Sequence, residues 1–155
     1  SDVCSSDLVR TKIEETKSLG MVAFEFIANT ALIRVPVRLN DGGPYSFLLD
    51  TGAATTLLSE KLADALRIPI ARRDILSTPS GQTQATIRTI EKIEMGSESR
   101  NRFDVAVTRS ALMEQMNVDG ILGGDFLKWF TVLIDYQAHT IEIRAKDLES
   151  SLLDV

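Results

Sequence analysis

The sequence has 155 residues, a hydrophobic content of 44%, a charged content of 25% and a formal net charge of −5. Its length and composition are those of one globular domain, and its acidic balance excludes the clustered Lys and Arg that a nucleic-acid-binding surface requires. Its single cysteine excludes an internal disulfide and a thiolate zinc site, and no apolar run approaches the roughly 20 residues of a membrane-spanning helix.

Both ends of the chain differ in composition from its centre. Residues 1–8 are similar to the translation of a common sequencing-library adapter, so we interpret them as a non-native leader; a natural Ser-rich terminus is the alternative. Residues 9–20 are polar and lack an apolar stripe, which predicts a linker. Residues 146–155 predict a tail, helical by its leucine spacing, that either docks on the domain or precedes another one. The domain itself is expected at residues 21–145.

The first part of this domain alternates residue types with the period of β-strands. The alternation covers residues 22–27 and Ile33–Leu39, which are rich in aromatic and β-branched side chains. Pro36 has no N–H donor, which favours an edge position or a bulge. Residues 40–43, Asn-Asp-Gly-Gly, tolerate positive φ and predict a turn into a strand over residues 45–50.

Two segments have the spacing and the flanking residues of short helices. Residues 59–67 place leucines and an alanine on one face, with Ser59 as the N-cap and a proline just beyond the end. Residues 126–130 form the second predicted helix, with Asp125 as its cap. Residues 110–116 could form a further short helix.

The remaining segments are short β-like pieces. Strands are expected over residues 82–95, 102–108, 132–135 and 140–144, separated by turn residues. In the first of these the alternation slips near residues 89–90, which we interpret as a bulge. Many short strands with two brief helices predict a mostly β fold, either a barrel or a sandwich.

One segment carries a pattern that points to chemistry. Asp50, Thr51, Gly52 and Ala53 follow the apolar residues 47–49. A carboxylate at the end of a buried strand is costly to ionise unless another group pairs with it or a reaction uses it. The threonine hydroxyl can donate and accept within a buried network, and the glycine lets a ligand or another backbone approach. Taken alone, however, Asp-Thr-Gly is also a common turn sequence.

A second segment strengthens the functional interpretation of this motif. Ile121, Leu122 and Gly123 form an apolar pair followed by glycines and a predicted helix. In this order the two segments resemble the retropepsin-like aspartic proteases, in particular their bacterial single-domain branch, over roughly residues 22–144. The resemblance implies a mostly β, closed-barrel acid protease fold with two short helices and one lobe per chain. It also implies that Asp50 is catalytic and that the later segment forms a ψ-shaped loop beside it.

The resemblance further implies that one chain supplies half of an active site. Aspartic proteases use two neighbouring carboxylates, whereas this sequence has one Asp-Thr-Gly and no Asp-Ser-Gly. The second carboxylate is expected from Asp50 of a second protomer, in a homodimer that cleaves peptide or protein substrates without a cofactor or a metal. By position, Thr51 would bond across the dimer, while Gly52 and Ala53 would line the cleft beside the substrate.

The turn formed by Pro79, Ser80, Gly81 and Gln82 is expected to be the tip of a β-hairpin flap. In the family this flap closes over the substrate, and glycine at the tip of a moving lid suits that role. An ordinary hairpin turn is the alternative explanation for Gly81.

The sequence departs from the viral members of the family at two positions. Those members typically carry an acidic residue after the alanine and an arginine after the later glycine, and the two side chains form an ion pair. Here Ala54 and Gly124 occupy these positions. Because both charges are absent together, neither is left unpaired.

Other residues give little support to different chemistry. His139, the only histidine, lies in a predicted turn, which favours a surface residue over a ligand or a base. Residues 120–124 lack the Lys-Ser/Thr that follows the glycines of a phosphate-binding loop. Two alternatives stay open: a catalytically silent dimerisation or peptide-binding module of the same fold, and a monomer that dimerises only on substrate. The bacterial resemblance favours a location in the cell envelope or export.

Overall fold

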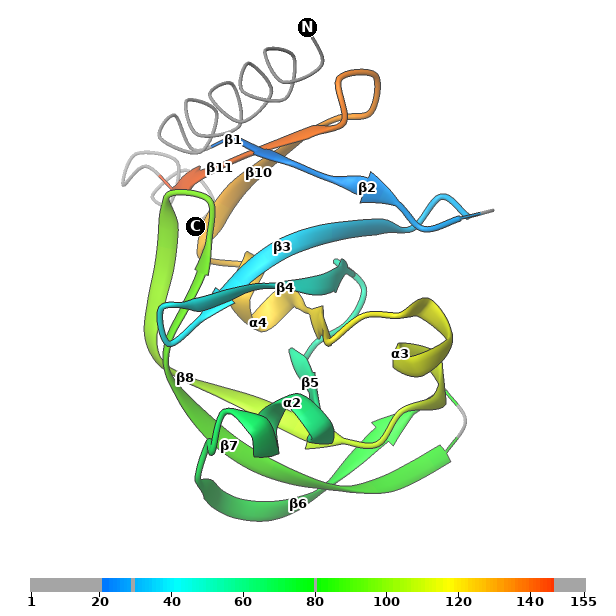
Figure 1. Cartoon of the computed structure of the whole chain (residues 1–155), viewed down its shortest axis with the longest axis vertical. Helices are drawn as coiled ribbons and strands as arrows, with labels where there is room; N and C mark the ends of the chain where they lie inside the picture. Colours follow the sequence, from blue (N-terminus) through cyan, green and yellow to red (C-terminus); the bar gives the residue numbers. More distant parts are fainter. Residues whose placement is uncertain (1–20, 29, 80, 147–155) are drawn as a thin grey trace, which may run out of the picture.

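The computed structural model describes residues 21–28, 30–79 and 81–146 (Figure 1). The adapter-like leader, the linker and the tail from residue 147 onward lie outside these residues, so the interpretations given for them stay predictions. The described part consists mostly of strands with three short helices, which confirms the mostly β fold expected from the sequence. None of these helices has the length and hydrophobicity needed to cross a membrane.

The strands form two sheets. A three-stranded sheet has the order β1 (Met21–Ala23), β11 (Thr140–Ala145) and β10 (Phe130–Asp135). An eight-stranded sheet has the order β2 (Glu25–Phe26), β3 (Ile33–Leu39), β4 (Gly42–Leu49), β9 (Gly120–Leu122), β5 (Leu57–Ser59), β8 (Glu98–Thr108), β7 (Gly81–Met95) and β6 (Ile70–Thr78). An additional pairing of β3 with β7 joins this sheet back on itself. The three-stranded sheet lies at one end of the molecule and the β6–β7 hairpin at the other (Figure 1).

The structure explains how β3 accommodates a proline. Residues of β3 alternate between buried and half-buried along its whole length. Pro36 pairs with Ser46 of β4 on one side. On the other side β2 pairs with β3 only at residues 33–34 and β7 only at residues 38–39, so neither strand pairs with the proline. The proline therefore stands at a locally open edge, where a missing N–H is tolerated, as its sequence suggested. The irregularity of this β3–β4 pair lies between Val37 and Leu39.

The first two helices begin at serine caps. α2 (Glu60–Ala65) starts where the sequence predicted, because the hydroxyl of Ser59 accepts the N–H of Leu62 at 3.2 Å. α3 (Ala111–Met116) also forms, and Ser110 caps it in the same way. The described residues thus hold three short helices: the two that were predicted and the further one that residues 110–116 could form.

The prediction for the last helix was wrong in both its bounds and its cap. α4 covers Gly124–Leu127 rather than 126–130, and β10 begins where the helix was expected to end. Its N-cap is Gly123, and Asp125 lies inside its first turn. The carboxylate of Asp125 accepts hydrogen bonds from Thr56, which is distant in sequence, and no local pattern could reveal that partner.

The bulge predicted near residues 89–90 was also wrong. β7 pairs with β8 in one continuous register across this region, from Ile87 opposite Ala106 to Ile90 opposite Phe103. Ile87 packs in a small cluster with Ala106, whereas Ile90 belongs to the main core. The alternation slips because successive stretches of this long strand bury opposite faces.

The core beneath the candidate site is fully buried. Phe47 of β4, Leu58 of β5 and Leu122 of β9 have no exposed surface, and Phe126 of α4 belongs to the same cluster. Burying a side chain of this size stabilises a fold by about 1.5–3 kcal/mol. These contacts therefore hold β4, β9 and β5 together where the two sequence motifs meet.

Candidate active site

β9 lies between β4 and β5, and this arrangement brings the two sequence motifs together (Figure 1). β9 runs parallel to β4, with Leu122 opposite Leu49, and antiparallel to β5, with Ile121 opposite Leu57. The chain leaves β4 at Asp50, forms a loop and returns as β5 on the other side of β9. β9 is therefore inserted between the two arms of this loop, and the role of residues 121–123 as the family's ψ-shaped loop stays a prediction.

The close approach of these strands depends on Gly120. A Cβ atom at this position would lie 2.5 Å from Cε2 of Phe47 and 2.6 Å from the carbonyl oxygen of Leu57. Both neighbours belong to the flanking strands, so any side chain here would push β9 away from them.

Asp50 directly follows β4 and is half-buried. Its backbone N–H donates to the carbonyl of Leu122 at 3.0 Å, which ties the start of the loop to β9. Its Oδ1 accepts the N–H of Gly52 at 3.0 Å, and its carbonyl accepts the N–H of Ala53 at 3.2 Å. The main-chain bonds hold the residue at the end of the strand, and the Gly52 N–H orients the carboxylate, which stays partly accessible to solvent.

The residues after Asp50 form the tip of the loop. Thr51 and Gly52 are exposed, and Ala53 is half-buried against the apolar cluster around Leu48 and Ile121. A Cβ at Gly52 would meet only Oδ1 of Asp50, at an ordinary 3.4 Å. Packing within one chain therefore does not require glycine at this position.

The loop that follows β9 contacts the Asp50 loop through main-chain atoms. The N–H of Gly124 donates to the carbonyl of Ala53 at 2.7 Å, and the N–H of Asp125 donates to the carbonyl of Ala54 at 3.2 Å. Main-chain hydrogen bonds thus connect the two segments at the positions where the ion pair of the viral family members is absent.

Asp125, which was predicted to cap a helix, links the same two loops through its carboxylate. Oδ1 of Asp125 accepts the hydroxyl of Thr56 at 2.6 Å, and its two oxygens accept the Thr56 N–H at 3.0 and 3.1 Å. Thr56 is fully buried, and its Oγ1 also accepts the N–H of Gly123 at 3.1 Å. Hydrogen bonds to a charged group are stronger than neutral ones, particularly away from water. The sequence contains a threonine and an aspartate in the two motif segments, but nothing in it shows that they meet.

We expect Asp125→Ala to lower the free energy of unfolding by about 2 kcal/mol, because the N–H and the hydroxyl of Thr56 would lose a charged acceptor in a buried site. Asp125→Asn keeps one acceptor oxygen and should have a smaller effect. Urea denaturation measures both. Asp135 supplies the control, since it also accepts two backbone N–H groups, but in an exposed turn. Asp135→Ala should cost less than about 1 kcal/mol, and equal losses at the two aspartates would contradict the role given to Asp125.

β6 and β7 form the hairpin that the sequence predicted. Thr78 pairs with Gly81 at the end of the hairpin, and Ser80, one of the predicted flap residues, lies outside the described residues. Pro79 and Gln82 are exposed. Gly81 has φ of +124°, a conformation that L side chains rarely adopt, which explains the glycine by turn geometry alone. A moving flap over the substrate stays a prediction.

Asp119 and His139 occupy structural positions. Oδ2 of Asp119 accepts the N–H of Ser46 at 3.0 Å, which fastens the start of β9 to β4. His139 lies in the β10–β11 turn, is exposed, and stacks on Phe24 with 5.5 Å between the ring centroids. Within the described ranges, no three or more His, Cys, Asp or Glu residues are grouped so that they could hold a metal ion.

The chain is similar to known aspartyl proteases in its sequence and in its fold. A family model described as aspartyl protease matches residues 35–126, whereas a search of curated proteins gave no match. Among solved structures, a retropepsin-like aspartic protease from Rickettsia conorii aligns with a TM-score of 0.54 and 17% identity over 81% of this chain and 91% of that one. EIAV protease, in complex with the inhibitor HBY-793, aligns with a TM-score of 0.51 and 20% identity over 67% of this chain and 91% of that one. The retroviral protease-like domain of Ddi1 from Leishmania major aligns with a TM-score of 0.50 and 16% identity, over 77% and 99% of the two chains.

At these identities the solved structures establish the fold, while the family model establishes kinship over more than half of the chain. The matched range runs from β3 to α4 and includes the Asp50 loop, β9 and the hairpin of β6 and β7. The chain therefore belongs to the aspartyl protease family and has a retropepsin-like fold.

Proposed function

We propose that this chain is an aspartic endopeptidase that works as a homodimer and activates a water molecule between the Asp50 carboxyls of two protomers. The observation that carries the proposal is the half-buried Asp50 at the end of β4 beside β9, whose carboxylate accepts the N–H of Gly52 and whose main chain bonds to Leu122. The described part of the chain has no second loop of this kind, and Asp119 bonds to Ser46 instead. One chain therefore offers half of the two-carboxylate site that this chemistry needs.

The reaction follows from the properties of a carboxylate pair. Two carboxylates held close together share one proton, because both cannot stay ionised at that separation. The ionised Asp50 removes a proton from water, whose oxygen attacks the carbonyl carbon of the peptide, while the protonated Asp50 donates to the carbonyl oxygen. The tetrahedral intermediate then breaks its C–N bond as a proton passes to the nitrogen. An acid and an amine leave, and no covalent intermediate with the protein forms.

The surroundings of Asp50 take supporting roles in this proposal. The exposed hydroxyl of Thr51 is assigned to the contact between the two loops of the dimer, and Gly52 and Ala53 to the wall of the cleft. Because packing within one chain does not demand glycine at 52, close approach of a substrate or a second protomer is the reason we give for it. The tip of the β6–β7 hairpin is assigned to a flap that covers the substrate and excludes water.

Specific activity is expected to fall when the protein is diluted, since a monomer has half a site. Well below the dissociation constant of the dimer, the cleavage rate should rise with the square of the protein concentration, because the rate follows the dimer population. Initial rates on a degenerate peptide library, measured alongside sedimentation velocity over the same concentrations, test this. A rate that stays linear while the protein sediments as a monomer would contradict the shared site.

The same experiment separates the enzyme from a silent module. A stable dimer that cleaves no peptide of the library between acidic and neutral pH would identify a dimerisation or peptide-binding domain. If an uncleaved peptide analogue raises the dimer fraction, dimerisation is coupled to substrate binding, and the quadratic rate law should then weaken at saturating substrate.

A further inference from the structure

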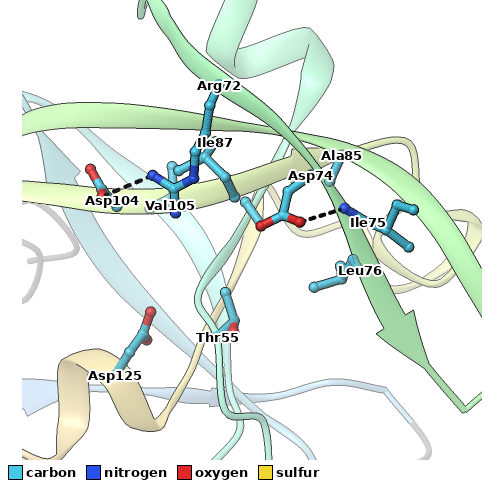
Figure 2. Close-up of a pocket in the computed structure, with 11 residues that line it drawn as sticks. Thr55, Arg72, Asp74, Ile75, Leu76, Ala85, Ile87, Asp104, Val105 and Asp125 are labelled. Atoms are coloured by element: carbon cyan, nitrogen blue, oxygen red, sulfur yellow. Dashed lines mark hydrogen bonds and ion pairs between the residues drawn. The ribbon is translucent and has the colours of Figure 1, made fainter.

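A cavity of about 310 Å³ adjoins the loop that carries Asp50 (Figure 2). Thr55 lines it from that loop, and Asp125 lines it from α4. The rest of its wall comes from the β6–β7 hairpin and β8: Arg72, Asp74, Ile75, Leu76, Ala85, Ile87, Asp104, Val105 and Ala106. Its volume is at the lower end of the range for small-molecule sites, about 300–1,000 Å³, which suits a side chain of a bound peptide.

The inner wall of this cavity is apolar. Ala85, Ile87 and Ala106 are buried and form one cluster, against which the half-buried Leu76 packs. These side chains offer a surface for the methylene stem of a long side chain, and covering them removes apolar area from water.

The charged groups around the opening are unequally partnered. The guanidinium of Arg72 is turned toward Asp104, at 3.9 Å, and Asp104 also accepts the hydroxyl of Thr89 at 2.7 Å. Asp125 is occupied by Thr56. Figure 2 shows the Asp74 carboxylate directed in among the lining side chains, where Oδ1 accepts the N–H of Ile75 at 2.8 Å.

Within the part of the chain that the structure describes, no basic side chain lies within ion-pair distance of Asp74. A negative charge directed into a cavity with an apolar wall favours a ligand that is aliphatic along its stem and cationic at its end. Lys and Arg are the side chains of that kind.

We propose that this cavity binds a substrate side chain and that Asp74 selects Lys or Arg there, an inference that rests on the proposed peptidase function. A peptide that reaches Asp50 passes the loop on which Thr55 lies, so a side chain near the scissile bond can enter the cavity. Arg72 opposes the selection in part, because it places a positive charge at the same opening, and its weak, exposed ion pair with Asp104 limits that opposition.

The test uses the full chain and matched peptides that carry Lys, Leu or Glu at one position, with that position moved along both sides of the scissile bond. At one position we expect kcat/KM to be about three- to fivefold higher for Lys than for Leu, the size of one partly exposed charge pair. Glu should be the poorest of the three there. Asp74→Asn should bring the Lys-to-Leu ratio close to one, and Arg72→Gln should raise it.

Glu91→Gln is the matched control, since it removes the same charge from an exposed position on β7 outside the cavity and should leave the Lys-to-Leu ratio unchanged. Equal cleavage of the three peptides at every position, a preference for Glu, or a Lys preference that survives Asp74→Asn would each overturn the inference and leave the peptidase function standing. Cleavage of none of the peptides would instead overturn the proposed function, and this inference with it.

Discussion

Asp50→Asn is expected to reduce peptide cleavage by at least about 1,000-fold, because an amide can neither accept the proton of the attacking water nor share a proton with its counterpart. The fold should be preserved. The amide oxygen of Asn can still accept the N–H of Gly52, and the backbone bonds of Asp50 to Leu122 and Ala53 do not involve the side chain. Cleavage of a peptide pool measures the first effect, and urea denaturation with sedimentation measures the second.

Mixing the variant with the wild-type protein sharpens this prediction. When subunits exchange, an excess of Asp50→Asn should draw wild-type chains into mixed dimers that hold one functional carboxylate, so activity should fall as the variant is added. Asp135→Asn is the matched control, since it makes the same change in an exposed turn and should not inhibit. Undiminished wild-type activity in mixtures that sedimentation shows to be mixed dimers would refute the shared site.

Gly123→Ala is expected to destabilise the fold by about 2–3 kcal/mol, because the added methyl group has no room. Its Cβ would lie 2.8 Å from the carbonyl carbon and oxygen of Thr55 and 3.0 Å from the carbonyl oxygen of Ala53. Both neighbours are backbone atoms of the loop that carries Asp50, so they cannot yield by a change of rotamer. Since Gly123 has φ of −104°, the cost arises from this contact and not from backbone strain. Activity should fall together with stability, because relief of the contact displaces the Asp50 loop.

The neighbouring glycine provides a close control. A Cβ at Gly124 would lie 3.3 Å from the carbonyl oxygen of Ala53, a distance that a small shift relieves, and the residue lies in the first turn of α4. Gly124→Ala should therefore change the free energy of unfolding by less than about 1 kcal/mol. Midpoints of urea unfolding compare the two variants. If both cost the same, the loop adapts freely and the close approach at Gly123 does not hold the site together.

Much of the fold could be predicted from local patterns. Period-2 alternation located β3, and a serine followed by helical spacing located α2. The motif with Asp50 was recognised because a carboxylate directly after an apolar strand is unusual and because Ile121, Leu122 and Gly123 follow in the right order. For the strand and the helix, the energetic terms act between residues that are near in sequence, so the sequence alone displays them. The Asp50 motif was identified differently, by the resemblance of two distant segments to a known family.

The same local reasoning failed where a residue's partner lies far along the chain. Asp125 satisfies the local rule for a helix cap, yet its carboxylate bonds to Thr56, 69 residues away. The slip in alternation near Ile90 was interpreted as a bulge, although β7 pairs in continuous register and buries first one face and then the other. Local patterns cannot show which neighbour covers each face of a strand.

The sequence by itself indicated most of the longer strands, the acidic balance and Asp50 as the candidate catalytic carboxylate. Only the tertiary structure decided that β9 inserts between β4 and β5, that Asp125 and Thr56 join the two motif loops, and that Asp74 faces a cavity beside them. The physical reason is that glycine clearances, buried hydrogen bonds and the partners of a charge depend on contacts between distant segments. Such contacts exist only after the chain has paired its strands.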